Sequence, residues 1–455
     1  MSCALKDQIL TLDQPVPRYT SYPTAPHFEP AKDASCYQDW LEALPASASL
    51  SLYVHVPYCS KLCWYCGCHT KITRQYDPVA EYVQVLLREI ELVADHLPTS
   101  SHIDVIHFGG GSPGMVSARD FDRIMNQIRQ KMNLRDTAEI SIELDPRGVT
   151  EARVATYARH GVNRISLGVQ DFDEKVLKHI NRPQPFHLTY QAVQLLHQYD
   201  IQKINFDLLY GLPFQTIDTM NRTLDQVICL NPNRVSLFGY AHVPWMKKHM
   251  RLIDESTLPQ KDLRYDLFET GSRRLIEAGY MAIGMDHFAK PDDPLAQAAL
   301  EKKIFRNFQG YTDHATDAMI GIGASSISHL PQGYVQNKVD QAGYRDAVLQ
   351  GRLPVHKQCH MDATDALHAD IIERIMCDFG VNLKEMGQKH AVRSEYFKTH
   401  LQKLKAYQTA GFVSISEEMV IKLSPEAKPI TRLIASVFDH YLLAQPSQPR
   451  HARAI

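Results

Sequence analysis

The sequence predicts an α/β protein built on a parallel sheet. Six short apolar segments read as strands, and each is followed by a segment that reads as a helix. Strict alternation of this kind is typical of parallel sheets. Because parallel crossovers are right-handed, two arrangements remain, a doubly wound open sheet or a full or partial barrel of the (β/α)8 kind. The expected strands are residues 52–56, 103–108, 139–144, 164–168, 203–209 and 234–239.

The helices are expected from apolar spacing and from their first residues. Asp77 and Pro78 open the first helix, whose apolar residues Val79, Val83 and Leu86 fall on one face. The second starts at Ser117, and its apolar residues also share a face. The four later helices are expected at residues 150–159, 187–199, 216–230 and 259–278.

Composition excludes several classes of protein. With 455 residues, 44% hydrophobic and 22% charged, the chain reads as an ordinary globular protein of two or three domains. A net charge of −2 and the lack of a basic block argue against nucleic acid as a partner. No apolar run approaches the roughly 20 residues of a membrane span, and residues 1–10 lack a signal pattern. A cytoplasmic location is expected.

Three domains are expected along the chain. Residues 1–45 are expected to form an irregular N-terminal arm, and Pro15, Pro17 and Pro23 exclude a helix near its centre. Residues 46–330 form the catalytic domain, and residues 331–455 a mainly helical, winged-helix-like domain. That last domain is predicted from helices at 365–378 and 395–409 and a hairpin at 412–423. With no basic face, it is expected to be structural or a lid.

Four of the nine cysteines lie directly after the first strand: Cys59, Cys63, Cys66 and Cys68. The other five are scattered, which favours metal or cluster chemistry over disulfides. Structural zinc usually takes two separated pairs, so zinc is disfavoured but stays open. Three thiolates from one loop can instead hold three irons of a cubane cluster and leave the fourth open to S-adenosylmethionine. Trp64 and Tyr65, between the ligands, could shield the cluster, stack on adenine or simply pack.

Unusual residues also follow the other strands, at the end where ligands bind parallel sheets. The glycine run 109–111 follows the second strand, Glu143 ends the third and Gln170 follows the fourth. Asp207 lies late in the fifth strand, and Ala241 and His242 follow the sixth. The two carboxylates are expected to bind ribose hydroxyls or an ammonium group; a salt bridge to Arg147 or Arg182 is the alternative.

These motifs resemble a known family. The triplet of Cys59, Cys63 and Cys66 in C-x3-C-x2-C is the signature of radical S-adenosylmethionine enzymes. More narrowly, the chain resembles the oxygen-independent coproporphyrinogen III oxidases over nearly its whole length. The stretches that carry this resemblance are PRYTSYPTAPHF, YVHVPYCSKLCWYCGCHTKITRQ, HFGGGSP, SIELDPR, RISLGVQDF, NFDLLYGLP, YAHVP, IGMDHFAKPDD and RNFQGYT.

The resemblance implies a partial (β/α)6 barrel of the radical SAM type and a 4Fe-4S cluster held by Cys59, Cys63 and Cys66. It implies two molecules of S-adenosylmethionine. The residues expected to contact the first are Tyr53, Gly110, Glu143 and Ile327. Those expected to contact the second are Gly111, Ser112, Gln170, Arg182, Asp207 and Ala241. Tyr65 and Gly67 are expected at the cofactor, and the residues expected to act in catalysis are Tyr53, Glu143, Phe308 and Gln309.

The implied function is the anaerobic oxidative decarboxylation of two propionates of coproporphyrinogen III to vinyl groups, giving protoporphyrinogen IX in haem biosynthesis. A 5′-deoxyadenosyl radical would abstract hydrogen from each propionate. An external electron donor and an external acceptor are required, and a monomer is expected. The alternative is a haem-binding chaperone of the same superfamily, but Cys68 and the PRYTSYPT arm favour the oxidase.

Some positions depart from the family pattern or stay open. His69 and Gly239 stand where Asn is common, and Ser112 stands for a usual Thr. These departures could alter the second cofactor site or the substrate. Cys68 matches a family cysteine that does not ligate the same cluster, and its role stays open. Candidate partners of the tetrapyrrole carboxylates, by charge alone, are Arg18, Lys290 and Arg306.

Overall fold

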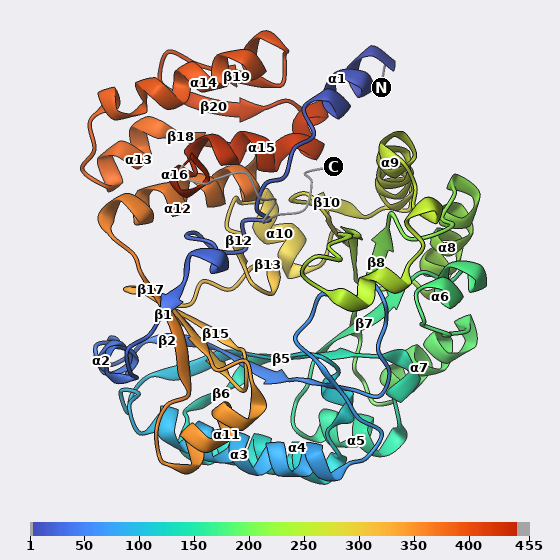
Figure 1. The fold of residues 1–455 in the computed structure, drawn as a ribbon, viewed down its shortest axis with the longest axis vertical. Helices are drawn as coiled ribbons and strands as arrows, with labels where there is room; N and C mark the ends of the chain where they lie inside the picture. The colour runs from blue at the N-terminus through green and yellow to red at the C-terminus, as the bar shows by residue number, and fades with distance from the viewer. Residues whose placement is uncertain (1–2, 444–455) are drawn as a thin grey trace.

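The computed structural model describes residues 3–443, and a single large sheet organises most of them (Figure 1). Its strand order is β1-β17-β16-β15-β14-β2-β5-β6-β7-β8-β9-β11-β10. The six predicted strands are its parallel centre, in chain order. They are β2 (Ser49–Val56), β5 (His102–Gly110), β6 (Leu134–Leu144), β7 (Arg164–Gln170), β8 (Lys203–Tyr210) and β9 (Arg234–Gly239). The predicted α/β fold with a partial barrel is confirmed.

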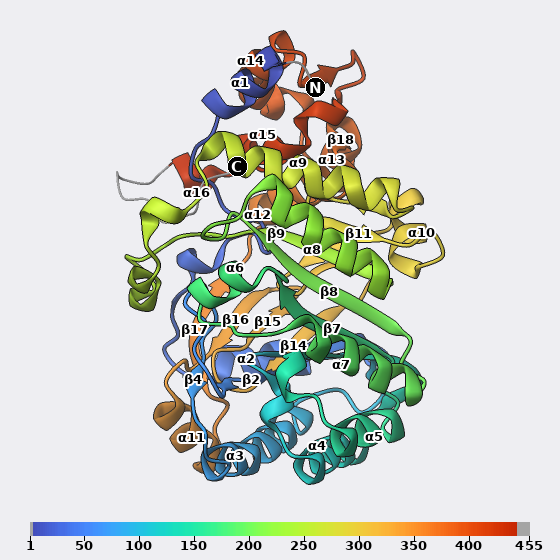
Figure 2. The same cartoon turned by 90° about the vertical axis from the view of Figure 1, so that its right-hand side faces the viewer.

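Helices follow the parallel strands and cover the outside of the sheet, as Figure 2 shows for α3, α4, α5 and α8. They are α3 (Asp77–Ala94), α4 (Ala118–Lys131), α5 (Glu151–Arg159), α7 (Phe186–Gln198), α8 (Ile217–Leu230) and α9 (Lys261–Glu277). A short helix that the sequence did not predict, α6 (Glu174–His179), follows β7. The buried faces of these helices pack on apolar strand residues such as Ile106, Ile142 and Phe206, which have no exposed surface.

Both edges of the sheet are formed by short strands that the sequence did not predict. On one edge β11 (His287–Ala289) and β10 (Met281–Ile283) are antiparallel. On the other, β14 (Ala318–Ile322) pairs in parallel with β2, and antiparallel strands follow it. These are β15 (Ile327–Leu330), β16 (Gly333–Asn337), β17 (Val355–His360) and β1 (Glu29–Pro30). The sheet thus continues past residue 330, and the division at 45 and 330 stays a prediction.

Two further helices and two small strand pairs surround the sheet. The helices are α10 (Pro294–Leu300) and α11 (Gln341–Leu349), and the strand pairs are β3 (Tyr58–Cys59) with β4 (Lys71–Ile72) and β12 (Phe305–Asn307) with β13 (Gly310–Thr312). None of the helices in the described part of the chain has the length and apolar content to cross a membrane.

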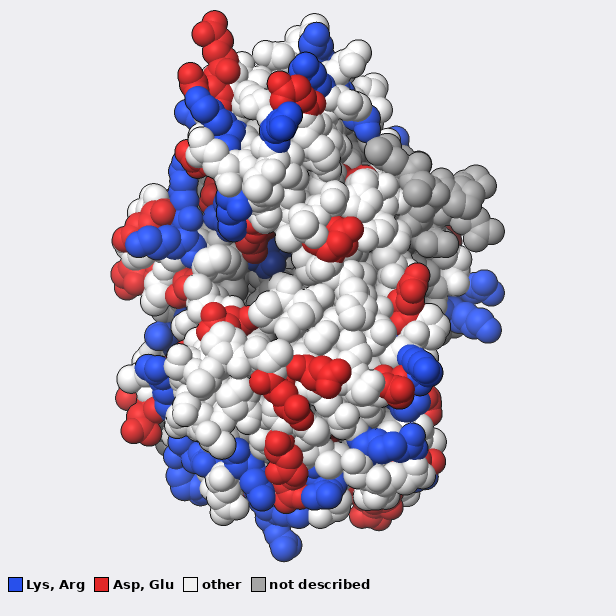
Figure 3. Space-filling view, turned by 90° about the vertical axis from the view of Figure 1, so that its left-hand side faces the viewer, with Lys and Arg blue, Asp and Glu red and all other residues white. Residues whose placement is uncertain are grey.

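The C-terminal region has a hydrophobic core of its own. The predicted hairpin is present as β19 (Val413–Ile415) and β20 (Val420–Leu423), and β18 (Gly380–Asn382) joins it. The helices are α12 (Ala363–Asp378), α13 (Leu383–Lys389), α14 (Lys398–Thr409), α15 (Thr431–Ala435) and α16 (His440–Leu443). Figure 3 shows one face of the molecule hollowed between this region and the barrel, with acidic and basic side chains mixed rather than separated by sign.

The N-terminal arm starts beside the C-terminal region and runs down past it to β1 at the edge of the sheet (Figure 1). It begins with α1 (Cys3–Thr11) and ends with α2 (Ser35–Glu42), neither of which was predicted, and the proline-rich part between them is irregular, as expected. Tyr19 donates a hydrogen bond to Asp439 at 3.0 Å, and the Tyr22 hydroxyl lies 2.9 Å from His440 Nδ1. The arm is therefore bonded to the C-terminal region.

Candidate active site at the carboxyl ends of the strands

The cysteine loop follows β2 and is fixed by hydrogen bonds from two other loops. The Trp64 amide donates to the carbonyl of Ile180 at 3.0 Å, and Asn181 Nδ2 donates to the carbonyl of Leu62 at 2.8 Å. On the other side, the loop after β9 places His249 Nε2 2.8 Å from the Cys66 carbonyl and Lys247 Nζ 3.1 Å from that of Cys68. The loop is thus held between the segments that follow β7 and β9.

Two arginines lie against the sulfur of Cys63. Arg182 Nη1 is 3.4 Å and Arg147 Nη2 is 3.9 Å from Cys63 Sγ. Both guanidinium groups also contact Asp145, which lies 3.2 Å from Arg182 Nη1. Burial raises the pKa of Asp145, but the charges of Arg182 and Arg147 outweigh it and lower the pKa to about 2. Asp145 therefore stays charged and holds the two arginines beside the thiol.

This donor set fits an iron-sulfur cluster. Positive charge beside a thiol stabilises the thiolate, which is the form that binds metal. Within residues 3–443, no three His, Cys, Asp or Glu side chains converge as ligands of a single metal ion. A cubane cluster instead takes one thiolate on each of several irons, so its ligands need not converge on a point. Cys68 lies next to Cys66, and its interaction with the Cys66 thiol lowers the pKa of that group.

Glu143 faces the interior of the barrel at the end of β6. Its Oε1 is 2.9 Å from His107 Nε2, and its Oε2 accepts a bond of 3.3 Å from the Gly110 amide. The ring of Tyr53 stacks on His107 with centroids 5.9 Å apart. The enclosure raises the pKa of Glu143, but the hydrogen bond and charge of His107 outweigh it, so the pKa is lowered overall. A salt bridge from Glu143 to Arg147 or Arg182, the alternative, is wrong, because Asp145 takes both arginines.

Asp207 faces the same interior from β8. Its Oδ2 accepts a hydrogen bond of 2.7 Å from Ser166, and its Oδ1 accepts one of 2.9 Å from Asn205. Burial and the nearby charge of Glu143 raise its pKa, while the Ser166 hydrogen bond opposes the shift. The two carboxylates are thus held in place by neighbours other than arginine and have lone pairs left for hydroxyl or ammonium donors.

The glycine run allows the β5 end to lie against the β2 end. Gly110 has a φ of +112°, and a Cβ there would lie 2.6 Å from the His55 ring. A Cβ on Gly111 would lie 2.6 Å from the Tyr58 carbonyl oxygen. Gly111 and Ser112 donate backbone bonds of 2.9 and 2.8 Å to Val56 and Tyr58. The run is therefore needed to position the segment that carries Cys59.

Most of the other predicted residues lie at the same end of the sheet. Arg182 Nη2 donates to the carbonyl of Gly168 at 2.5 Å, and the Gln170 side chain lies over Gly168 at the end of β7. Ala241 follows β9, and Ile327 begins β15 with its backbone against Gly321 of β14. Gly67 is exposed, with no other atom close to the position of a Cβ. Trp64 and Tyr65 pack on a small apolar cluster that includes residues of α6.

Phe308 and Gln309 lie elsewhere, in the turn between β12 and β13. Gln309 Nε2 lies 3.8 Å from the sulfur of Met319 on β14, and Phe308 lines a cavity of about 490 Å³ beneath the arm. The structure shows no hydrogen bond from either side chain to the residues at the strand ends. Their expected part in catalysis stays a prediction, as do the roles of the other site residues.

Sequence reasoning missed several residues at this site. His107 and Asp145 stand at strand ends beside predicted residues, so the rule that pointed to Glu143 could have found them. His249 and Lys247 contact the cysteine loop from a segment more than 170 residues away, and no local pattern marks them. Lys290 was predicted by charge alone as a partner of the tetrapyrrole carboxylates, and that prediction is wrong. Its amine donates to the carbonyl of Asn231, at the opposite end of β9 from the site.

Comparisons with known proteins agree with this architecture. Residues 53–227 match the model of the radical SAM superfamily. The chain is 44% identical to the oxygen-independent coproporphyrinogen III oxidase of Bradyrhizobium diazoefficiens over 97% of this chain and 98% of that protein. It is 37% identical to the Helicobacter pylori enzyme of that name, over 94% and 95%.

A solved structure is similar over nearly the whole fold. The coproporphyrinogen III oxidase of Escherichia coli, described as a radical SAM enzyme, superposes with a TM-score of 0.89 at 33% identity. The match covers 94% of this chain and all of that one. The cysteine loop and the carboxylates lie at one edge of a partial barrel, and the relatives match this chain over nearly its whole length. The chain therefore belongs to the oxygen-independent coproporphyrinogen III oxidase family of radical SAM enzymes.

Proposed function

We propose that the protein converts two propionate side chains of coproporphyrinogen III to vinyl groups without oxygen, giving protoporphyrinogen IX in haem biosynthesis. The observation that carries the proposal is the 44% identity to a named oxidase over 97% of the chain. The relatives described above are all named as oxidases, and none supports the chaperone alternative. The substrate is a tetrapyrrole, and the enzyme is a radical SAM oxidoreductase.

Membership of the superfamily implies a 4Fe-4S cluster and S-adenosylmethionine. We propose Cys59, Cys63 and Cys66 as the ligands of the cluster, a choice supported by the arginines beside Cys63. When bound, the cluster and S-adenosylmethionine supply one-electron chemistry that generates a 5′-deoxyadenosyl radical. Arg182 contributes positive charge at the sulfur, and the Trp64 and Asn181 hydrogen bonds hold the loop in register.

The proposal includes two molecules of S-adenosylmethionine. Tyr53, Gly110 and Glu143, with Ile327, would hold the one at the cluster, where the lowered pKa of Glu143 keeps a negative charge for its ammonium group. Asp207 would accept hydroxyl hydrogen bonds from the second. The residues proposed beside Asp207 at that second position are Gly111, Ser112, Gln170, Arg182 and Ala241. The support is the presence of two separately held carboxylates on strands β6 and β8.

The remaining partners are proposed from the chemistry. Abstraction of a hydrogen atom from each propionate leaves a substrate radical, and loss of carbon dioxide from it to form the vinyl group releases one electron. An external acceptor must take that electron, and an external donor must reduce the cluster. We propose that the protein works as a monomer in the cytoplasm, with no nucleic acid bound.

The test is an anaerobic assay with reconstituted protein, reductant, S-adenosylmethionine and coproporphyrinogen III. The expected products are 5′-deoxyadenosine and protoporphyrinogen IX, detected after oxidation as protoporphyrin. Formation of 5′-deoxyadenosine without a vinyl product would point to another substrate. Haem binding without turnover would favour the chaperone.

A further inference from the structure

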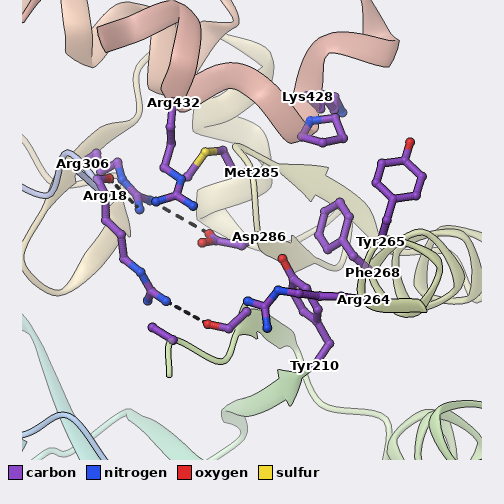
Figure 4. Close-up of a pocket in the computed structure, with 13 residues that line it drawn as sticks. Arg18, Tyr210, Arg264, Tyr265, Phe268, Met285, Asp286, Arg306, Lys428 and Arg432 are labelled. Atoms are coloured by element: carbon purple, nitrogen blue, oxygen red, sulfur yellow. Dashed lines mark hydrogen bonds and ion pairs between the residues drawn. The ribbon is translucent and has the colours of Figure 1, made fainter. Parts of the chain in front are cut away.

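A small cavity beside the candidate active site is lined by five cationic side chains and one carboxylate (Figure 4). Tyr210 and Gly239 place it at the carboxyl ends of β8 and β9, the edge that also carries Asp207. The cations come from the arm, from α9, from β12 and from the C-terminal region. They are Arg18, Arg264, Arg306, Lys428 and Arg432.

Arg306 has donors with no partner in the cavity. Its side chain is only 4% exposed, yet its Nε and Nη1 make no hydrogen bond. The nearest carboxylate oxygen, Oδ1 of Asp286, lies 4.0 Å from Nη1 and already accepts a bond of 2.7 Å from His287. Buried guanidinium donors are normally paired, so this one points to an absent acceptor.

Among the described residues that line the cavity, five cations face a single carboxylate, Asp286. Burial, together with the charges of Arg18 and Arg306, lowers the pKa of Arg432 to about 10, while Asp286 opposes the shift. Arg432 Nη1 donates to the carbonyl of Val16 at 3.3 Å, so the side chain is held in the cavity. An anion bound here would relieve the mutual repulsion of the cations.

Arg264 reaches the cavity because residue 239 has no side chain. A Cβ on Gly239 would lie 2.8 Å from Arg264 Nη2 and 2.9 Å from the Tyr210 hydroxyl. Arg264 also lies over the ring of Tyr210, with its guanidinium carbon 5.2 Å from the centroid. Figure 4 shows Arg18 and Arg264 on the two sides of this strand end, with the Arg18 guanidinium bonded to the Gly239 carbonyl.

We propose that this cavity binds the carboxylates of the propionate side chains that are not being converted. The inference rests on the proposed function and names the site that anchors its substrate. Arginine binds carboxylates through two parallel hydrogen bonds, which fixes orientation as well as position. The cavity volume is about 70 Å³, far below that of a pocket for a whole drug-sized ligand, so it admits side-chain carboxylates and leaves the macrocycle outside.

The test measures binding of coproporphyrin III, the stable oxidised tetra-acid, by fluorescence, with its tetramethyl ester as the uncharged probe. The variants are Arg264→Met and Arg306→Met, and Lys290→Met removes one charge far from the cavity as the control. We expect each arginine variant to bind the tetra-acid about 10- to 100-fold more weakly, as for loss of a charge-assisted hydrogen bond. Ester binding and the Lys290→Met variant should match the wild type. Arg306→Lys, which keeps the charge, should recover part of the affinity.

Two results would overturn the inference. One is equal tetra-acid affinity in the arginine variants and the wild type while all stay folded by circular dichroism. The other is an arginine effect confined to binding of S-adenosylmethionine by the reconstituted protein, which would assign the cavity to the carboxylate of that cofactor. Wild-type turnover of coproporphyrinogen III tests the proposed function separately, so the failure of either idea can be told from the failure of the other.

Discussion

Gly111→Ala tests whether the glycine run positions the cysteine loop. The new methyl group would lie 2.6 Å from the Tyr58 carbonyl oxygen, whereas ordinary contact begins at 3.4 Å. The neighbour is backbone, so the segment before Cys59 has to move by about 0.8 Å, and overpacking of this kind costs about 1–3 kcal/mol. We expect a lower unfolding midpoint and less bound iron and sulfide per chain. A shift approaching 1 Å at a reacting centre also lowers turnover by up to about 100-fold.

Gly148→Ala is the matched control, because a Cβ there meets no atom within 4 Å. Urea unfolding and iron and sulfide content are measured for both variants after anaerobic reconstitution. The control should stay within about 0.5 kcal/mol of the wild type. If Gly111→Ala has the control's unfolding midpoint and cluster content, close approach of β5 to the cysteine segment does not position the loop.

Three further predictions follow from single contacts. Burial raises the pKa of Glu89 from 4.5 to about 7 despite three hydrogen bonds to its carboxylate. The proton is therefore bound more tightly in the folded state. The protonated Glu89 carboxyl contributes fully to the free energy of unfolding below pH 4.5. This contribution is lost as the pH rises through 7, by about 3 kcal/mol in all. The urea unfolding midpoint of the wild type should fall as the pH rises from 5 to 8, and the midpoint of Glu89→Gln should not. An equal fall in both proteins would contradict this assignment to Glu89. Cys63→Ala should abolish the cluster and Cys68→Ala should retain it, and loss of iron and sulfide in the second variant would show that our ligand choice is wrong. Gly239→Asn should displace Arg264 and weaken coproporphyrin III binding about tenfold or more, whereas unchanged affinity would separate residue 239 from the cation cavity.

Local patterns were sufficient for the centre of the fold. Helical spacing in α3 and the apolar runs of β2 and β5 are properties of short segments, and six such pairs in alternation admit few topologies. One edge was missed because its strands, β10 and β11, have only three residues each. A segment that short shows no period, and its pairing depends on the strand beside it.

The candidate site, like the fold, could be predicted from the sequence only in part. The spacing of Cys59, Cys63 and Cys66 and the rule that ligands bind at strand ends were enough to identify the loop, Glu143 and Asp207. Neither could tell that Asp145 would take Arg182, one of the two arginines named in the alternative, because that pairing depends on where side chains 37 residues apart meet.

The sequence by itself determined the parallel sheet, the cysteine loop and the edge of the sheet, at the carboxyl ends of the strands, where the candidate active-site residues lie. Only the tertiary structure decided what surrounds that edge. Arg18 and Arg432 are more than 400 residues apart in the chain, yet they line one cavity with Arg306. Periodicity and ligand spacing are local, whereas a cavity between arm, barrel and C-terminal region exists only once all three have packed together.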